Sequence, residues 1–157
     1  MKTILFAVTS LFVAAVPALA ADQAKPAAAE YLSSEQTLKS KLPFSEAVRV
    51  GNTLYLSGVI GFAPGTRTLV PGGIEGQTRQ AMETIRAVLT RNGSSLDDIV
   101  KCTVMLADMS EWAKMNAIYV TYFTKHFPAR SAMGVNGLAL GAQVEIECIA
   151  TVGGAGR

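Results

Sequence analysis

One long stretch of this sequence, residues 74–92, repeats apolar side chains at helical spacing, and shorter strand-like runs lie on both sides of it. The residues that share one face of the predicted helix are Ile74, Thr78, Ala81, Met82, Ile85, Val88 and Leu89. Gly93 follows directly and is a typical helix stop. Because a helix with one apolar face must bury that face, the neighbouring strands are expected to supply a sheet for it.

Before this helix, the sequence predicts a β-hairpin. The strand-like runs 47–50 and 53–57 are joined by Gly51-Asn52, and a two-residue turn of this composition is a strong hairpin signal. A short strand is also expected at Tyr31-Leu32. Residues 60–73 are rich in glycine, proline and threonine, which predicts a loop.

After the helix, the sequence predicts a strand, a second helix and two last strands. Apolar side chains recur at every second position of residues 100–106, which predicts a strand. The side chains expected on one side of it are Val100, Cys102, Val104 and Leu106. Asp108, with an acid three residues later, resembles a capping box, so the second helix is expected over 111–126. The last strands are expected at 130–135 and 143–152.

This order of elements predicts an α+β fold, with a single mixed sheet and two helices packed on one face. The second sheet face is not expected to be fully polar, so contact between copies of the chain is plausible there. The apolar residues that suggest this are Val50, Leu54, Leu56, Val144 and Ile149. The second helix has an aromatic stripe, which favours core or interface packing over a cofactor site. Its members are Trp112, Met115, Tyr119, Tyr122 and His126.

The N-terminus has the pattern of a Sec-type signal peptide. A basic start and a short apolar run end in Ala18-Leu19-Ala20, which predicts cleavage after residue 20. The alternative is a membrane anchor, but an apolar run of about 13 residues is shorter than the roughly 20 that span a bilayer. We therefore expect a signal peptide at 1–20, a flexible tether at 21–29 and one domain at 30–157. The mature protein is expected to be periplasmic or secreted, with no membrane contact.

Charge and composition argue against several classes of function. Removing residues 1–20 removes Lys2, so the formal net charge falls from +2 to +1, and no basic cluster stands out. Nucleic acid is therefore not an expected partner. A single histidine and the absence of a close cysteine pair give no metal pattern, and no cofactor is implied. Cys102 and Cys148 could form a disulfide, although two buried free thiols are the favoured interpretation.

Two segments near the C-terminus carry residues suited to chemistry on a small organic acid. The first is Phe127–Ser131, where Arg130 offers a planar fork of donors for a carboxylate. The second is Val144–Ala150, where Glu145 and Glu147 alternate with apolar residues and so point to the same sheet face. The simpler interpretations are a surface or interface ion pair of Arg130, with Glu145 as one possible partner, and a solvated edge strand for the two glutamates.

These segments resemble the C-terminal signature of the Rid/YjgF family of reactive-intermediate (enamine/imine) deaminases, some of which are described as ribonucleases. The early strand of that family is similar to Gly51–Gly58. Three further segments also occur in the family's order, namely 77–81, 98–101 and 116–119. The resemblance extends from about Tyr31 to Val152, and its specificity comes from six short motifs in the right order.

The resemblance implies a chorismate-mutase-like fold, a homotrimer and a ligand cleft at each subunit boundary. It implies that Arg130 binds the substrate carboxylate and that Glu145 positions a water and transfers protons. Water would attack a 2-imino acid, and the resulting carbinolamine would collapse to a 2-oxo acid and ammonia. Ser57 would contact substrate or water, and Asn116 would reach toward the neighbouring cleft and contact ligand or water there. Phe44 would form part of the pocket wall.

This sequence departs from the deaminating members at three positions. Phe44 stands where a tyrosine is frequent, Val59 where a glutamine is frequent, and Ala132 where a cysteine is frequent. Two other functions are therefore weighed beside hydrolysis, a non-catalytic binder of small carboxylates and a holdase-like chaperone. The sequence identifies neither the native substrate nor a source of imines outside the cytoplasm.

Overall fold

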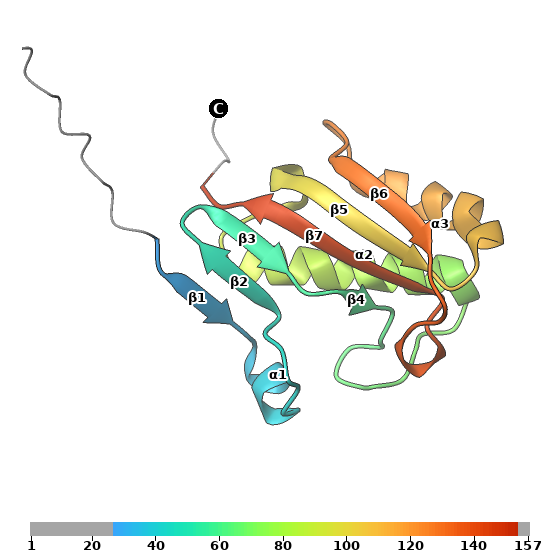
Figure 1. Cartoon of the computed structure of the whole chain (residues 1–157), viewed down its shortest axis with the longest axis horizontal. Helices are drawn as coiled ribbons and strands as arrows, with labels where there is room; N and C mark the ends of the chain where they lie inside the picture. The colour runs from blue at the N-terminus through green and yellow to red at the C-terminus, as the bar shows by residue number, and fades with distance from the viewer. Residues whose placement is uncertain (1–26, 154–157) are drawn as a thin grey trace, which may run out of the picture.

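The computed structural model describes residues 27–153, which form one seven-stranded mixed sheet with the two longer helices on one face (Figure 1). In chain order the strands and α-helices are β1 (Ala29–Leu32), α1 (Glu35–Lys39), β2 (Ala47–Val50), β3 (Thr53–Leu56), β4 (Val59–Ile60), α2 (Gly73–Arg91), β5 (Ile99–Leu106), α3 (Trp112–Tyr119), β6 (Ala129–Gly134) and β7 (Val144–Thr151). The expected signal peptide, 1–20, lies outside the described residues, as does most of the expected tether. No helix among residues 27–153 is long and apolar enough to cross a membrane.

The strands lie side by side in the order β1-β2-β3-β7-β5-β6, and β4 pairs with the other half of β7. All pairs are antiparallel except β5 and β6, which are parallel and are joined through α3. The predicted hairpin is present as β2 and β3, with Val50 opposite Thr53. The predicted fold class is confirmed.

The core lies between the sheet and α2, as the apolar stripe of the predicted helix requires. Every member of that stripe is buried, and α2 begins and ends within one residue of the predicted bounds. Large side chains from the sheet and both helices are fully enclosed, each contributing about 1.5–3 kcal/mol by burial. They include Leu54, Met82, Ile85, Leu89, Leu106, Met115 and Ile146.

Several local predictions were wrong. The second helix is shorter than 111–126, because α3 continues only as a 3₁₀ turn to Tyr122 and the chain becomes extended at Phe123. Phe123 thereby packs its ring 4.9 Å from that of Tyr119. On β5, Val100 faces solvent and Ile99 is buried, because the register shifts between Ile99 and Lys101. The short elements α1 and β4 were not predicted.

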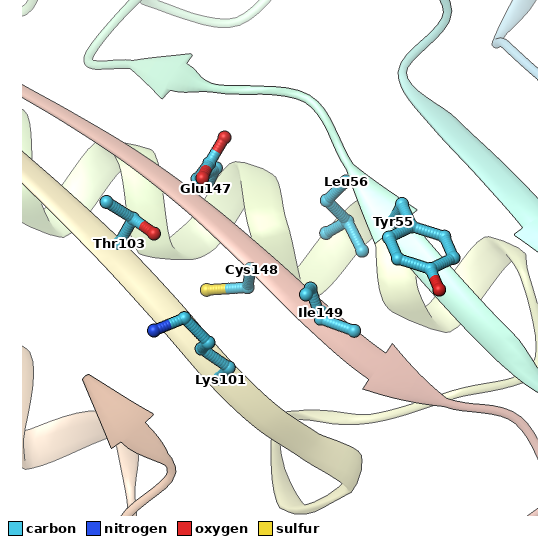
Figure 2. A pocket seen from close by; sticks show the side chains of 7 residues that line it. All are labelled: Tyr55, Leu56, Lys101, Thr103, Glu147, Cys148 and Ile149. Carbon is cyan, nitrogen blue, oxygen red and sulfur yellow. The ribbon is translucent and has the colours of Figure 1, made fainter. Parts of the chain in front are cut away.

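The face of the sheet opposite α2 and α3, here called the open face, is partly apolar, and two of the five residues expected there, Val50 and Ile149, lie on it. Leu54, Leu56 and Val144 are buried in the core on the helix side. The open face also carries Tyr55, which is 48 % exposed, and Met133, which is 43 % exposed. Figure 2 shows part of this face, where a shallow pocket lies between β3, β5 and β7. Its lining residues are Tyr55, Leu56, Lys101, Thr103, Glu147, Cys148 and Ile149.

The two cysteines form a disulfide, so the expectation of free thiols was wrong although both are buried. Cys102 on β5 is directly opposite Cys148 on β7, and the two Cα atoms are 4.1 Å apart. This register joins strands that are distant in sequence, so spacing along the chain could not reveal it. The bond links two central strands of the sheet across a sequence separation of 46 residues.

Replacing Cys102 and Cys148 together by alanine is expected to lower the free energy of unfolding by about 2–4 kcal/mol, because the unfolded chain loses a long closed loop. Urea unfolding of the oxidised wild type and of the double variant measures this difference. Reduced wild type is the matched control and should unfold at the same urea concentration as the variant. Equal midpoints for oxidised and reduced wild type would contradict the prediction.

Candidate functional site

Arg130 lies on the helix side of the sheet and is held by α3. Its position on β6 is in parallel register with the buried Cys102, which places both on the face that α3 covers. The Arg130 Nη1 atom donates a hydrogen bond of 2.9 Å to Asn116 Oδ1. The guanidinium carbon is 4.7 Å from the ring centroid of Tyr119 and 5.8 Å from that of Trp112. We call Trp112, Asn116, Tyr119 and Arg130 the clamp group.

The two aromatic rings of the clamp group were not predicted as site residues. Trp112 and Tyr119 lie four residues before and three residues after Asn116, so helical spacing brings them to its side of α3. They attract the guanidinium through cation–π contact and limit its freedom, which prepares it to bind an anion. Burial raises the pKa of Tyr119 to about 12, although the charge of Arg130 opposes this shift. The phenol therefore stays neutral at ordinary pH.

Glu145 lies on the open face. On β7 it is opposite Ile60 of β4 and Met105 of β5, and it is half-buried. A Cβ atom on Gly58 would collide with the Glu145 carboxylate, so the glutamate side chain lies directly against the Gly58 backbone and would have to move if Gly58 were replaced. Burial and the neighbouring charge of Glu147 both raise the pKa of Glu145 above its ordinary value. A carboxyl group with a raised pKa is better suited to accept and return a proton near neutral pH.

Ser57 and Phe44 are connected to the surroundings of Glu145 through Gly58 and Ser45. Ser57 directly precedes Gly58, and its hydroxyl donates a hydrogen bond of 2.7 Å to the carbonyl of Ser45. Phe44 directly precedes Ser45, and its side chain is 51 % exposed. We call Phe44, Ser57, Gly58 and Glu145 the glutamate group. Since the serine hydroxyl already donates within the chain, only its acceptor side is free for a ligand.

The five predicted site residues therefore form two half-sites, and one subunit does not bring them together. Arg130 and Asn116 are on the helix side, whereas Glu145 projects from the open face three register positions further along the sheet. Within one subunit Arg130 and Glu145 do not pair with each other, and no ion pair among residues 27–153 includes either of them. The shallow pocket of Figure 2 contains neither half-site. No group of acidic, histidine or cysteine side chains in this part of the chain could hold a metal ion.

A family model described as Endoribonuclease L-PSP matches residues 34–152 of this chain. The chain belongs to the Rid/YjgF family. Within the family it is similar to the mouse protein named 2-iminobutanoate/2-iminopropanoate deaminase, with 43 % identity over 71 % of this chain and 82 % of the mouse protein. It is 39 % identical to the chloroplastic Reactive Intermediate Deaminase A of Arabidopsis thaliana, over 78 % of this chain and 66 % of the plant protein.

Solved structures of Rid/YjgF proteins have the same fold. The Rid family protein YyfA from Yersinia pestis superimposes with a TM-score of 0.74 at 40 % identity, over 80 % of this chain and all of that one. TdcF from E. coli, whose crystal structure contains bound serine, gives a TM-score of 0.67 at 28 % identity, over 77 % of this chain and 92 % of TdcF.

Proposed function

We propose that this protein hydrolyses reactive 2-imino and enamino acids to 2-oxo acids and ammonia, at a site that two subunits of a homotrimer build together. The coarser statement, that it is a deaminase-like hydrolase, rests on relatives at about 40 % identity that are named 2-iminobutanoate/2-iminopropanoate deaminase or Reactive Intermediate Deaminase. The observation that carries the finer proposal is the arginine clamp. Arg130 is fixed by one amide and two aromatic rings and keeps donors free for a carboxylate.

In the proposed reaction, the substrate carboxylate binds to Arg130, and Asn116 and Tyr119 fix the direction of the guanidinium. Glu145 of the adjacent subunit accepts a proton from a water molecule as that water attacks the carbon of the protonated imine, which gives a neutral carbinolamine. Glu145 then returns this proton to the nitrogen, the C–N bond breaks with loss of ammonia, and the hydroxyl proton passes through Glu145 to solvent as the carbonyl of the 2-oxo acid forms. Arginine does not titrate in this scheme, so proton transfer depends on the glutamate alone.

The proposed subunit boundary follows from the two half-sites. A clamp group on one face and a glutamate group on the other can meet only if neighbouring copies contribute one each. The partly apolar open face, with Tyr55 and Met133, supplies surface that association would bury. Three copies related by a rotation would then carry three equal sites.

Mixing two inactive variants tests this assembly. Arg130→Ala lacks the clamp and Glu145→Gln lacks the base, so trimers of one kind have no complete site. Co-expressed in equal amounts, they are expected to recover about one quarter of wild-type activity, because a quarter of the boundaries combine an intact Arg130 with an intact Glu145. Light scattering should give a trimer for every sample. An absence of recovery in proven mixed trimers would place the site within one subunit and contradict the proposal.

A non-catalytic carboxylate-binding function is the second candidate. It is favoured by TdcF, which holds serine, an amino acid with a free carboxylate, in its crystal structure. The loss of a tyrosine hydroxyl at Phe44 also removes a polar group from the proposed pocket wall. An in situ assay separates the two candidates. An amino-acid oxidase generates the imine, and semicarbazide competes for it. Hydrolysis faster than the uncatalysed rate supports the enzyme, whereas 2-oxo acid binding without hydrolysis supports the binder.

We also propose that the mature protein acts outside the cytoplasm. The N-terminal pattern predicts export, and the buried Cys102–Cys148 disulfide is independent support because such bonds persist in oxidising compartments. Mass spectrometry of protein from its native host is expected to find an N-terminus near Ala21 in the extracytoplasmic fraction. Full-length protein in the cytoplasm, with both thiols reduced, would contradict the proposal.

A further inference from the structure

Glu46 is the centre of a polar cluster beside the glutamate group. Its Oε1 atom accepts hydrogen bonds from the Ser34 hydroxyl at 2.7 Å and the Thr37 hydroxyl at 2.6 Å. Its Oε2 atom accepts from the Ser34 backbone N–H at 3.0 Å and from Arg91 Nη2 at 2.7 Å. One carboxylate thus ties the start of α1 and the end of α2 to the strand entry at β2.

The same residue is fixed to Ser57 through its backbone. The Ser57 N–H donates to the Glu46 carbonyl at 3.0 Å, and the Ser57 hydroxyl donates to the carbonyl of Ser45. Phe44 directly precedes Ser45 in the chain. Ser45 and Glu46, the two residues that follow Phe44, are therefore held from two sides, by Ser57 within the glutamate group and by the bonds of the Glu46 carboxylate.

The contacts of the cluster favour an ionised carboxylate. Burial alone would raise the pKa of Glu46, but the hydrogen bonds from Thr37, Ser34 and Arg91 and the charge of Arg91 outweigh it, and the pKa is lowered. Among the described residues, Arg91 is the only charged side chain that bonds to it. The stabilising contribution is present above the ordinary pKa of a glutamate and is lost as the pH falls through the lower folded value.

We propose that Glu46 is a positioning residue, which holds Phe44 in place as the wall of the substrate cleft and so sets how tightly the substrate is bound. The inference rests on the proposed function, since Phe44 lines the cleft only if the glutamate group belongs to it. The ligand concerned is a small 2-imino or 2-oxo acid, whose side chain would contact the Phe44 ring while its carboxylate binds to Arg130 of the neighbouring subunit. Glu46 itself touches no reacting atom.

Glu46→Gln tests the proposal, with Glu35→Gln as the matched control. Glu35 lies on α1 and pairs with Lys39 in an exposed ion pair at 3.5 Å, outside the cluster. In Glu46→Gln, amide hydrogen exchange of residues 33–46 is expected to rise by about 10- to 100-fold, because charge-assisted hydrogen bonds are lost. Exchange of residues 80–90 in α2 should stay at the wild-type rate, and the control should match wild type throughout.

Binding and turnover distinguish a positioning role from a purely structural one. In Glu46→Gln, the Kd for 2-oxobutanoate and the KM for its imine are expected to rise by about 5- to 10-fold while kcat changes by less than about two-fold. Arg91→Met should also raise the Kd and the KM, by a smaller factor. Faster exchange with an unchanged Kd would overturn the positioning role. So would unchanged exchange in Glu46→Gln, or an equal effect in Glu35→Gln. The exchange and Kd measurements do not need turnover, so they remain decisive if the protein proves to be a binder.

Discussion

Glu145→Gln is expected to slow imine hydrolysis by about 10²- to 10⁴-fold, the range typical for the loss of a general acid–base group. Glutamine keeps the shape of the side chain and fits the space beside Gly58, so the fold should be unchanged. It cannot accept a proton from water. The Kd for a 2-oxo acid should stay within about two-fold of wild type, because the carboxylate of the ligand binds to Arg130 of the adjacent subunit. Stopped-flow assays of kcat and calorimetry of binding measure the two quantities separately.

The pH dependence of kcat provides a control for the assignment of Glu145 as the general base. Glu145 must be ionised to accept a proton, so kcat should fall on the acid side as the pH drops through its raised pKa. The charge of Glu147 contributes to that raised value. Glu147→Gln should therefore lower the pKa of Glu145 and move the acid limb of the profile to lower pH, with little effect at neutral pH. If the acid limb of the kcat–pH profile does not move in Glu147→Gln, or if Glu145→Gln keeps full activity, Glu145 does not act as the base in this mechanism.

Arg130→Ala is expected to weaken ligand binding and kcat/KM by about 30- to 150-fold, since a charge-assisted bidentate contact is worth about 2–3 kcal/mol. The same change removes the cation that lies against Tyr119 and Trp112, so the free energy of unfolding should be checked in parallel. Calorimetric titration with 2-oxobutanoate measures the loss directly.

Arg130→Lys is the matched variant, because it keeps the charge and loses the planar fork. It should recover less than about one tenth of the lost affinity, since a point charge cannot bind a carboxylate in two places or bond Asn116 in the same geometry. If both variants bind 2-oxobutanoate like wild type, Arg130 does not bind the substrate, and neither the enzyme nor the binder is supported.

The elements of this fold that have strong local signals were predictable from the sequence. The α2 stripe, the Gly51-Asn52 turn and the last strand were found with bounds close to the observed ones. The weak elements were not, because α1 and β4 are short and rely on contacts with distant residues. Strand β4, for example, exists through its pairing with β7.

The predicted site residues were found in two places because side-chain direction depends on register, which spacing along the chain does not give. Arg130 is opposite Cys102 and Glu145 is opposite Met105, an odd number of residues further along β5, so the two point to opposite faces. The same long-range register brings Cys102 to Cys148. Glu46 was also missed, since its partners at 34, 37 and 91 meet only in three dimensions.

The single parallel pairing in the sheet makes the clamp group a unit of its own. Parallel strands need a crossover, and α3 is that crossover between β5 and β6. Residues 99–134 therefore contain the whole clamp group in one continuous stretch of chain, whereas the glutamate group is divided between 44–60 and β7. Preference for the acid group of a substrate could then change through substitutions in one segment, without altering the parts that position water. The Cys102–Cys148 bond is a direct covalent cross-link between this stretch and β7, which carries Glu145.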